Sequence, residues 1–171
     1  MAFPAPVLER AANIELVAFD VDGVLTDGKL YYADDGRELK AFHVQDGAAL
    51  KLMLSHGIVV AIITGRTSSV VSRRAQELGI DHVYQGVMDK GAALAELTAT
   101  VGTTLERAAY VGDDLPDLGV FDKAGMAISV PNAHPVAAAA AHYVTLTAGG
   151  AGAAREIAQL FLEARGTWPY G

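Results

Sequence analysis

The chain has 171 residues, a length typical of one domain, and its composition of 51% hydrophobic and 19% charged residues argues against a disordered chain. A formal net charge of −7 argues against a broad nucleic-acid-binding surface and against binding to an anionic membrane. The sequence contains no cysteine, which excludes thiolate chemistry, and its first residues lack a signal-peptide pattern, so we expect a cytoplasmic protein.

Short apolar runs alternate with amphipathic segments along the chain, which is typical of a parallel sheet with helices on both faces. We expect strands at 15–20, 58–64, 81–86, 107–114 and 126–130, and helices at 47–57, 68–79, 90–102 and 153–166. The β-branched run at 58–64 indicates a strand buried on both sides. The sequence therefore predicts an α/β protein, a Rossmann-like three-layer α/β sandwich, formed as a single domain over residues 1–171.

Residues 28–44 interrupt this alternation after the first strand. Two strand-like runs flank the segment ADDGR, which contains Asp35-Gly36. An Asp-Gly pair between such runs is a strong signal for a tight turn. We therefore predict a β-hairpin insert at about residues 28–43, called the hairpin below.

Polar side chains follow three of the predicted strands at their carboxyl ends. Asp20 and Asp22 end the first strand, Thr64-Gly65-Arg66 follows the second, and Asp113-Asp114 ends a later one. In an open parallel sheet, ligands bind in the crevice beyond the carboxyl ends of the strands. We therefore expect these side chains to meet at one edge of the sheet.

Carboxylates gathered in such a crevice repel one another unless protons or a cation relieve the repulsion. The set Asp20, Asp22 and Asp113 offers only oxygen ligands. Mg²⁺ prefers oxygen ligands and is commonly held by one or two carboxylates together with waters and a substrate phosphate. The sequence therefore predicts a Mg²⁺ site.

These residue types also suit phosphoryl transfer. A carboxylate such as Asp20 can form a covalent aspartyl-phosphate, and Asp22 is placed to act as general acid and base. The anionic phosphate needs neutralisation, which Mg²⁺ and Lys90 can supply, while the Thr64 hydroxyl and nearby backbone N–H groups can bind its oxygens.

The same motifs resemble those of the haloacid dehalogenase superfamily of phosphotransferases. Asp20-Val21-Asp22-Gly23 resembles its first motif, Thr64-Gly65-Arg66 its second, Lys90 its third, and Gly112-Asp113-Asp114 with Asp117 its fourth. The resemblance implies Asp20 as nucleophile and Asp22 as general acid and base. It also implies that the Asp20 and Asp113 carboxylates and the Asp22 carbonyl hold Mg²⁺.

The resemblance assigns further residues to the site. It implies that Thr64, Gly65, Lys90 and the Gly23 backbone bind phosphate. Asp114 and Asp117 would support the metal ligands from behind, with Asp114 also able to replace one.

Only about forty residues separate the first two motifs, which is too few for a cap domain and resembles the capless branch of the superfamily. DVDGVLTDG, the hairpin, FHVQDG, AIITGR and GGAGAAREI (149–157) together resemble the 3-deoxy-D-manno-octulosonate 8-phosphate phosphatases. This resemblance implies Mg²⁺-dependent hydrolysis of that sugar phosphate, in lipopolysaccharide precursor synthesis. It also implies a homotetramer in which the hairpins and the tail at 166–171 help neighbouring subunits complete each active site.

Substrate specificity is less defined by the motifs. Arg66 and Arg74 match positions that contact the anionic sugar in the family, whereas Gln45 stands where the family usually has arginine. His43 is either a substrate contact or an exposed edge residue. The tail is either a cover for a neighbouring site or a frayed end.

Three alternatives stay open from the sequence. The first is a phosphatase for a related nonulosonate 9-phosphate or another small phosphate ester. The second is a phospho-accepting signalling module, although Asp22 suits rapid turnover better than a long-lived acyl phosphate. The third is a catalytically idle interaction protein, although every motif position is filled.

Overall fold

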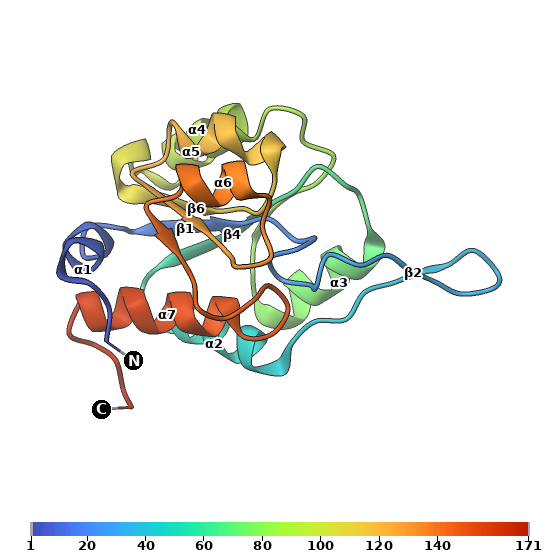
Figure 1. Cartoon of the computed structure of the whole chain (residues 1–171), viewed down its shortest axis with the longest axis horizontal. Helices are drawn as coiled ribbons and strands as arrows, with labels where there is room; N and C mark the ends of the chain where they lie inside the picture. The colour runs from blue at the N-terminus through green and yellow to red at the C-terminus, as the bar shows by residue number, and fades with distance from the viewer. Residues whose placement is uncertain (1, 171) are drawn as a thin grey trace.

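The computed structural model describes residues 2–170 and is built around a six-stranded parallel sheet (Figure 1). Met1 and Gly171, the ends of the predicted domain and tail, lie outside the described residues. The strand order is β5-β4-β1-β6-β7-β8, and each neighbouring pair is parallel. The strands are β1 (Leu16–Phe19), β4 (Val59–Ile63), β5 (His82–Tyr84), β6 (Ala108–Val111), β7 (Met126–Ser129) and β8 (Tyr143–Val144).

Helices cover both faces of this sheet (Figure 1). One face carries α1 (Ala5–Ala11), α2 (Val44–Ser55), α3 (Ser69–Leu78) and α7 (Ala153–Ala164), and the other carries α4 (Lys90–Val101), α5 (Leu118–Phe121) and α6 (Pro135–Ala140). Because side chains alternate along a strand, β1 contributes Val17 and Phe19 to the first core and Leu16 and Ala18 to the second. The predicted three-layer α/β fold is confirmed.

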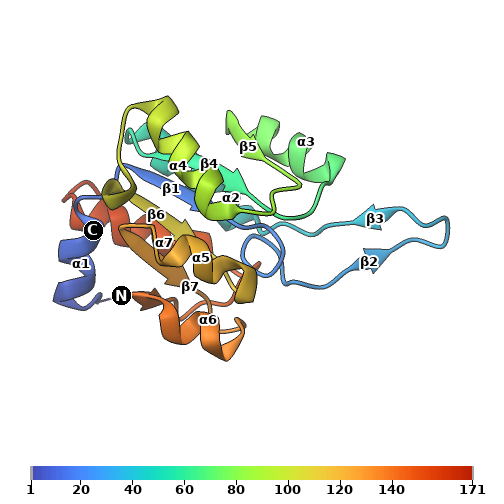
Figure 2. The same cartoon turned by 90° about the horizontal axis from the view of Figure 1, so that it is seen from above.

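The predicted hairpin is also confirmed. Strands β2 (Tyr31–Tyr32) and β3 (Glu38–Leu39) pair antiparallel and project from the body of the molecule (Figure 2). Gly36 has a φ of +83°, a conformation that glycine adopts without strain, so it closes the turn. Between β1 and β4 the described chain forms only this hairpin and α2, and therefore no cap domain.

Some elements differ from the sequence-based expectation. The helix predicted at 47–57 begins three residues earlier, at Val44. The short elements α1, α5, α6 and β8 were not expected. Within residues 2–170, every helix is too short or too polar to cross a lipid bilayer.

Candidate active site

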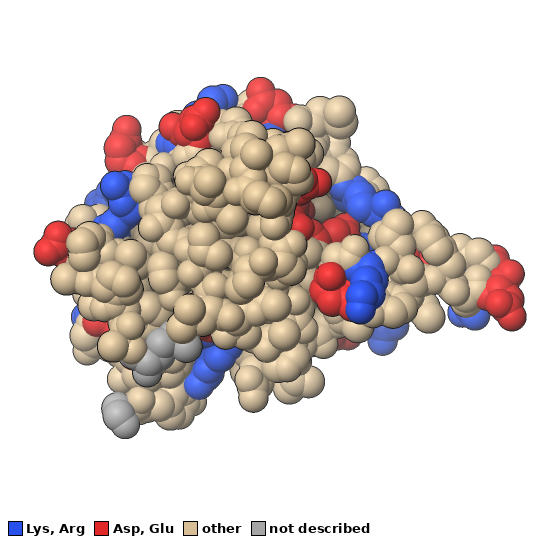
Figure 3. Space-filling view, in the orientation of Figure 1, with Lys and Arg blue, Asp and Glu red and all other residues tan. Residues whose placement is uncertain are grey.

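The carboxyl ends of β1, β4 and β6 open into a crevice of about 460 Å³. Acidic side chains are visible in a hollow near the base of the hairpin (Figure 3). Most of the predicted site residues line this crevice. They are Asp20, Asp22, Thr64, Gly65, Arg66, Lys90, Asp113, Asp114 and Asp117.

Lys90 connects two carboxylates at the floor of the crevice. Its Nζ lies 2.6 Å from Oδ2 of Asp20 and 2.6 Å from Oδ1 of Asp117. Lys90 is the first residue of α4, where the side chain of Asp89 caps the helix by accepting from the N–H of Ala92. Burial lowers the pKa of Lys90, but the charges of Asp20 and Asp117 outweigh burial and the net shift is upward. Lys90 is therefore an ammonium at neutral pH.

Asp117 organises the turn that follows β6. Its Oδ2 accepts from the N–H groups of Asp113, at 2.9 Å, and Asp114, at 3.1 Å. Its Oδ1 accepts from Lys90 and from the Tyr110 hydroxyl, the latter at 3.3 Å. Because both oxygens are already bonded, Asp117 holds the turn and Lys90 in place.

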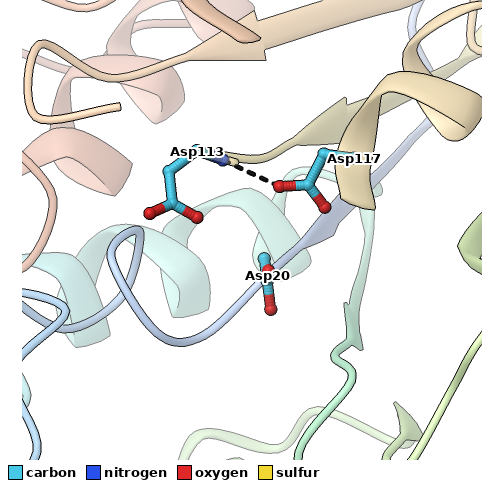
Figure 4. A group of neighbouring side chains, drawn as sticks. All are labelled: Asp20, Asp113 and Asp117. Carbon is cyan, nitrogen blue, oxygen red and sulfur yellow. Dashed lines mark hydrogen bonds between the residues drawn. The ribbon is translucent and has the colours of Figure 1, made fainter. Parts of the chain in front are cut away.

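Asp113 presents its carboxylate to the same space as Asp20 (Figure 4). One oxygen from each of Asp20, Asp113 and Asp117 lies within 4.8 Å of the others. Gly23 permits this approach, because a Cβ there would lie 1.9 Å from Oδ2 of Asp113. Gly23 also has a φ of +86°, in the left-handed region that favours glycine.

The electrostatics of the carboxylates favour a bound cation. Burial, followed by the charges of Asp20 and Asp117, raises the pKa of Asp113 to about 7. Burial also raises the pKa of Asp20, although Lys90 opposes the shift. These carboxylates offer the oxygen ligands that Mg²⁺ prefers, and the ion would relieve the repulsion that the raised pKa values express.

The side chain of Asp22 faces the hairpin. Its Oδ1 lies 2.5 Å from Nζ of Lys40, and that Nζ lies 2.8 Å from Oε1 of Glu38. Arg66 completes the group, with Nη2 at 2.8 Å from Oε2 of Glu38 and Nε at 3.6 Å from Oδ2 of Asp22. Sequence reasoning missed Lys40 and Glu38. Their spacing of two residues, which places both on one side of an extended strand, is the signal that points to them.

Thr64 directly follows β4, where its backbone N–H donates to the carbonyl of Tyr84 and its carbonyl accepts from the N–H of Val87. Thr64 is 2% exposed, and its hydrogen-bonded backbone fixes the position of the side chain at the crevice wall. Gly65 follows directly and lines the same wall.

Arg74 is not brought into the crevice. Its guanidinium lies 5.9 Å from the Phe42 ring centroid, and its Nη1 lies 3.4 Å from Oε2 of Glu77. The reason is its position on α3, which directs the side chain toward α2, where a Cβ on Gly47 would lie 2.2 Å from Nη2.

The remaining candidates also lie apart from the crevice. His43 is the N-cap residue of α2, and Gln45 is exposed on its first turn. In the tail, Trp168 and Tyr170 pack on the Arg155 guanidinium, which lies 4.9 Å and 5.3 Å from their ring centroids. The described part of the tail therefore packs on α7 of its own chain.

A carboxylate directly after the central strand, an ammonium beside it and a second acid after the neighbouring strand define a phosphohydrolase of the haloacid dehalogenase type. The family model of the haloacid dehalogenase-like hydrolases matches residues 79–157.

Individual relatives match most of the chain. The 3-deoxy-D-manno-octulosonate 8-phosphate phosphatase KdsC of Yersinia pestis is 48% identical over 159 residues, which cover 93% of this chain and 85% of the relative. The enzyme of the same name from Escherichia coli K12 is 47% identical over 162 residues, covering 95% of this chain and 86% of the relative.

A solved structure extends the likeness to the fold. The 3-deoxy-D-manno-octulosonate 8-phosphate phosphatase of Moraxella catarrhalis, in complex with magnesium ion, phosphate ion and KDO, aligns with a TM-score of 0.93 at 48% identity. The alignment covers 96% of this chain and 94% of that chain. The chain belongs to the 3-deoxy-D-manno-octulosonate 8-phosphate phosphatases of the haloacid dehalogenase superfamily.

Proposed function

We propose that the chain hydrolyses 3-deoxy-D-manno-octulosonate 8-phosphate to the free sugar acid and inorganic phosphate. The observation that carries this proposal is the arrangement of Asp20, Asp113 and Lys90 around one space, with Asp20 and Asp113 oxygens within 4.8 Å and Lys90 2.6 Å from Asp20. The relatives of this name and the neighbour solved with magnesium, phosphate and KDO support the choice of substrate.

In the proposed reaction, an Asp20 oxygen attacks phosphorus as the bond to the sugar oxygen breaks, and Asp22 gives a proton to that leaving oxygen. Asp22 then takes a proton from water as the water attacks the aspartyl-phosphate, which releases phosphate and regenerates Asp20. Lys90 offsets the negative charge of nucleophile and phosphate throughout.

Asp20, Asp113 and the Asp22 carbonyl would hold Mg²⁺, with Asp114 and Asp117 supporting them. When bound, this ion neutralises the charge shared by the Asp20 carboxylate and the phosphate. The Thr64 hydroxyl and backbone N–H groups near Gly23 and Gly65 would bind the phosphoryl oxygens.

Arg66 is the candidate contact for the sugar carboxylate, because its side chain is 46% exposed at the crevice and an arginine can bind a carboxylate through two hydrogen bonds. Arg74 would need a change in its packing against Phe42 to take part.

A substrate panel tests this proposal. Phosphate release is measured from 3-deoxy-D-manno-octulosonate 8-phosphate, a nonulosonate 9-phosphate and glucose 6-phosphate, each with Mg²⁺ and with EDTA. We expect the highest kcat/KM with the first substrate and no release in EDTA. A higher kcat/KM with either other ester would overturn the substrate assignment. A stable acyl phosphate without turnover would favour a signalling module instead.

We further propose one domain over residues 1–171, a cytoplasmic location in lipopolysaccharide precursor synthesis, and a homotetramer whose neighbouring subunits complete each site. The hairpin supports the proposal of an assembly, since it exposes four large apolar side chains in the single chain. These are Leu30, Tyr31, Tyr32 and Leu39.

A further inference from the structure

The segment GGAGAAREI has no part in the chemistry above, yet it packs directly on the catalytic turn. We call residues 146–152 the glycine loop and residues 20–28 the catalytic turn. The N–H of Gly150 donates to the Val24 carbonyl at 2.9 Å. A Cβ on Gly149 would lie 1.8 Å from the Gly23 carbonyl oxygen, and one on Gly150 would lie 2.4 Å from the carbonyl carbon of Thr26. Glycine is therefore required for the two backbones to touch.

Asn132 links these two segments. Its Nδ2 donates to the Gly23 carbonyl at 2.8 Å, and its Oδ1 accepts from the N–H of Gly149 at 2.7 Å. One side-chain amide thus uses both its donor and its acceptor to join the catalytic turn to the glycine loop.

The glycine loop is itself anchored at both ends by buried carboxylates. Glu156 accepts from the N–H groups of Leu146, at 2.8 Å, and Thr147, at 2.9 Å. Asp46, on α2, accepts from the N–H of Gly152 at 3.3 Å. Glu156 and Asp46 are each 3% exposed, so the loop rests on the core and resists displacement.

Gly23 is consequently enclosed from two sides. The glycine loop lies against its carbonyl, and Asp113 lies where its Cβ would be. The two peptide groups that flank Gly23 are both bonded, since its N–H donates to Oγ1 of Thr26 at 3.3 Å and its carbonyl accepts from Asn132. The first of these peptide groups contains the Asp22 carbonyl, one of the proposed metal ligands.

We propose that Asn132 and Gly149 are positioning residues for the metal site. They fix the Gly23 backbone against Asp113 and so set the spacing between the Asp22 carbonyl and the Asp113 carboxylate. This inference rests on the proposed Mg²⁺ site, and it assigns a role to GGAGAAREI and to Asn132.

Two variants and one control test the inference. Asn132→Ala removes both hydrogen bonds, and Gly149→Ala adds a methyl group against Gly23. Gly119→Ala is the matched control, because a Cβ there meets open space. For each folded protein, Mg²⁺ affinity is measured by calorimetry without substrate, unfolding is followed in EDTA, and kcat and KM are determined at several Mg²⁺ concentrations.

We expect Mg²⁺ affinity to fall about tenfold or more in Gly149→Ala and to fall measurably in Asn132→Ala, while the control keeps wild-type affinity. At limiting Mg²⁺ the variants should lose kcat with little change in the KM for sugar phosphate, and added Mg²⁺ should restore part of the loss. If Gly149→Ala does not fold, Asn132→Ala decides the outcome, since it shortens only a surface side chain.

Wild-type Mg²⁺ affinity in folded Asn132→Ala, with or without a lower melting temperature, would overturn this inference and leave the proposed function standing. Absence of Mg²⁺ binding by the wild-type chain would overturn the metal site, and this inference with it.

Discussion

Each oxygen of the Asp20 carboxylate has its own hydrogen-bond partner. Oδ2 meets the Lys90 ammonium at 2.6 Å, and Oδ1 accepts from the N–H of Val21 at 2.7 Å. These contacts orient the carboxylate, while its burial keeps water from competing with a phosphate for it.

The nucleophile assignment predicts the effect of Asp20→Asn. An amide is nearly the same size but cannot form the acyl phosphate, so phosphate release should fall about 10³-fold or more with the fold intact. Phosphate release and circular dichroism check both parts, with Asp35→Asn at the exposed hairpin turn as control. Turnover at the wild-type level would refute the assignment.

Asp113 predicts a pH dependence of metal binding. Burial and neighbouring carboxylates raise its pKa from 3.8 to about 7 in the metal-free chain. The folded chain thus retains a proton that the unfolded chain loses, and its stability falls as pH rises through this interval. Mg²⁺ must displace the same proton, so affinity should rise roughly fivefold from pH 6 to pH 7 and about twofold from pH 7 to pH 8.

Calorimetry at these three pH values, in buffers with different ionisation enthalpies, measures both the affinity and the proton released. Asp113→Asn should bind Mg²⁺ more weakly and lose this pH dependence. A constant wild-type affinity from pH 6 to pH 8 would contradict the expectation.

At the scale of elements, the hairpin is fastened to the catalytic turn by a buried cation. The Lys40 side chain is 2% exposed and contacts Asp22 and Glu38, whose side chains are 21% and 23% exposed. The ion pairs therefore join an inserted element to the residue proposed as general acid and base.

Replacement of this cation predicts a loss of stability. Lys40→Met leaves two partly buried carboxylates with fewer partners, so the free energy of unfolding should fall by about 1–2 kcal/mol. Lys29→Met is the control within the hairpin, because Lys29 is 74% exposed and its change should cost less than about 0.5 kcal/mol. Urea unfolding measures both values, and equal losses in the two variants would show that Lys40 does not fasten the hairpin.

The elements also show which parts of the fold are determined by residues that are neighbours in the sequence. The apolar run 58–64 and the Asp35-Gly36 turn carry their structure in neighbouring residues, and both were predicted from sequence. Helix α6 has only six residues in an alanine-rich stretch, and β8 has two, so neither has a periodic pattern long enough to recognise.

The candidate site follows the same division. Residues at strand ends, such as Asp20 and Thr64, could be assigned to one crevice because parallel topology brings strand ends together. The contact between Asp22 and Lys40 joins residues 18 positions apart through the path of the hairpin, which local patterns do not specify. The direction of the Arg74 side chain was likewise not predictable from the sequence, because it depends on how α3 packs against α2.

For the whole molecule, the exposed hairpin predicts self-association. Tyr32 is 61% exposed, and burial of such a ring between subunits would stabilise an assembly. Light scattering coupled to size-exclusion chromatography should give the mass of four chains, and Tyr32→Asp should yield smaller species. Val136→Asp, at a residue that is 50% exposed on α6, serves as control and should leave the mass unchanged. A monomeric wild type would contradict the proposed homotetramer.

The glycine loop is hydrogen-bonded to both segments that join the hairpin to the body. Its Gly150 N–H donates to the catalytic turn, and its Gly152 N–H donates to Asp46 at the start of α2. Together with the ion pairs of Lys40 and Glu38, these contacts hold the base of the hairpin against the site, so we expect displacement of the hairpin to be confined to the turn around Gly36. We therefore expect that the length and sequence of the turn can vary without a change in the chemistry, provided that Glu38 and Lys40 are kept.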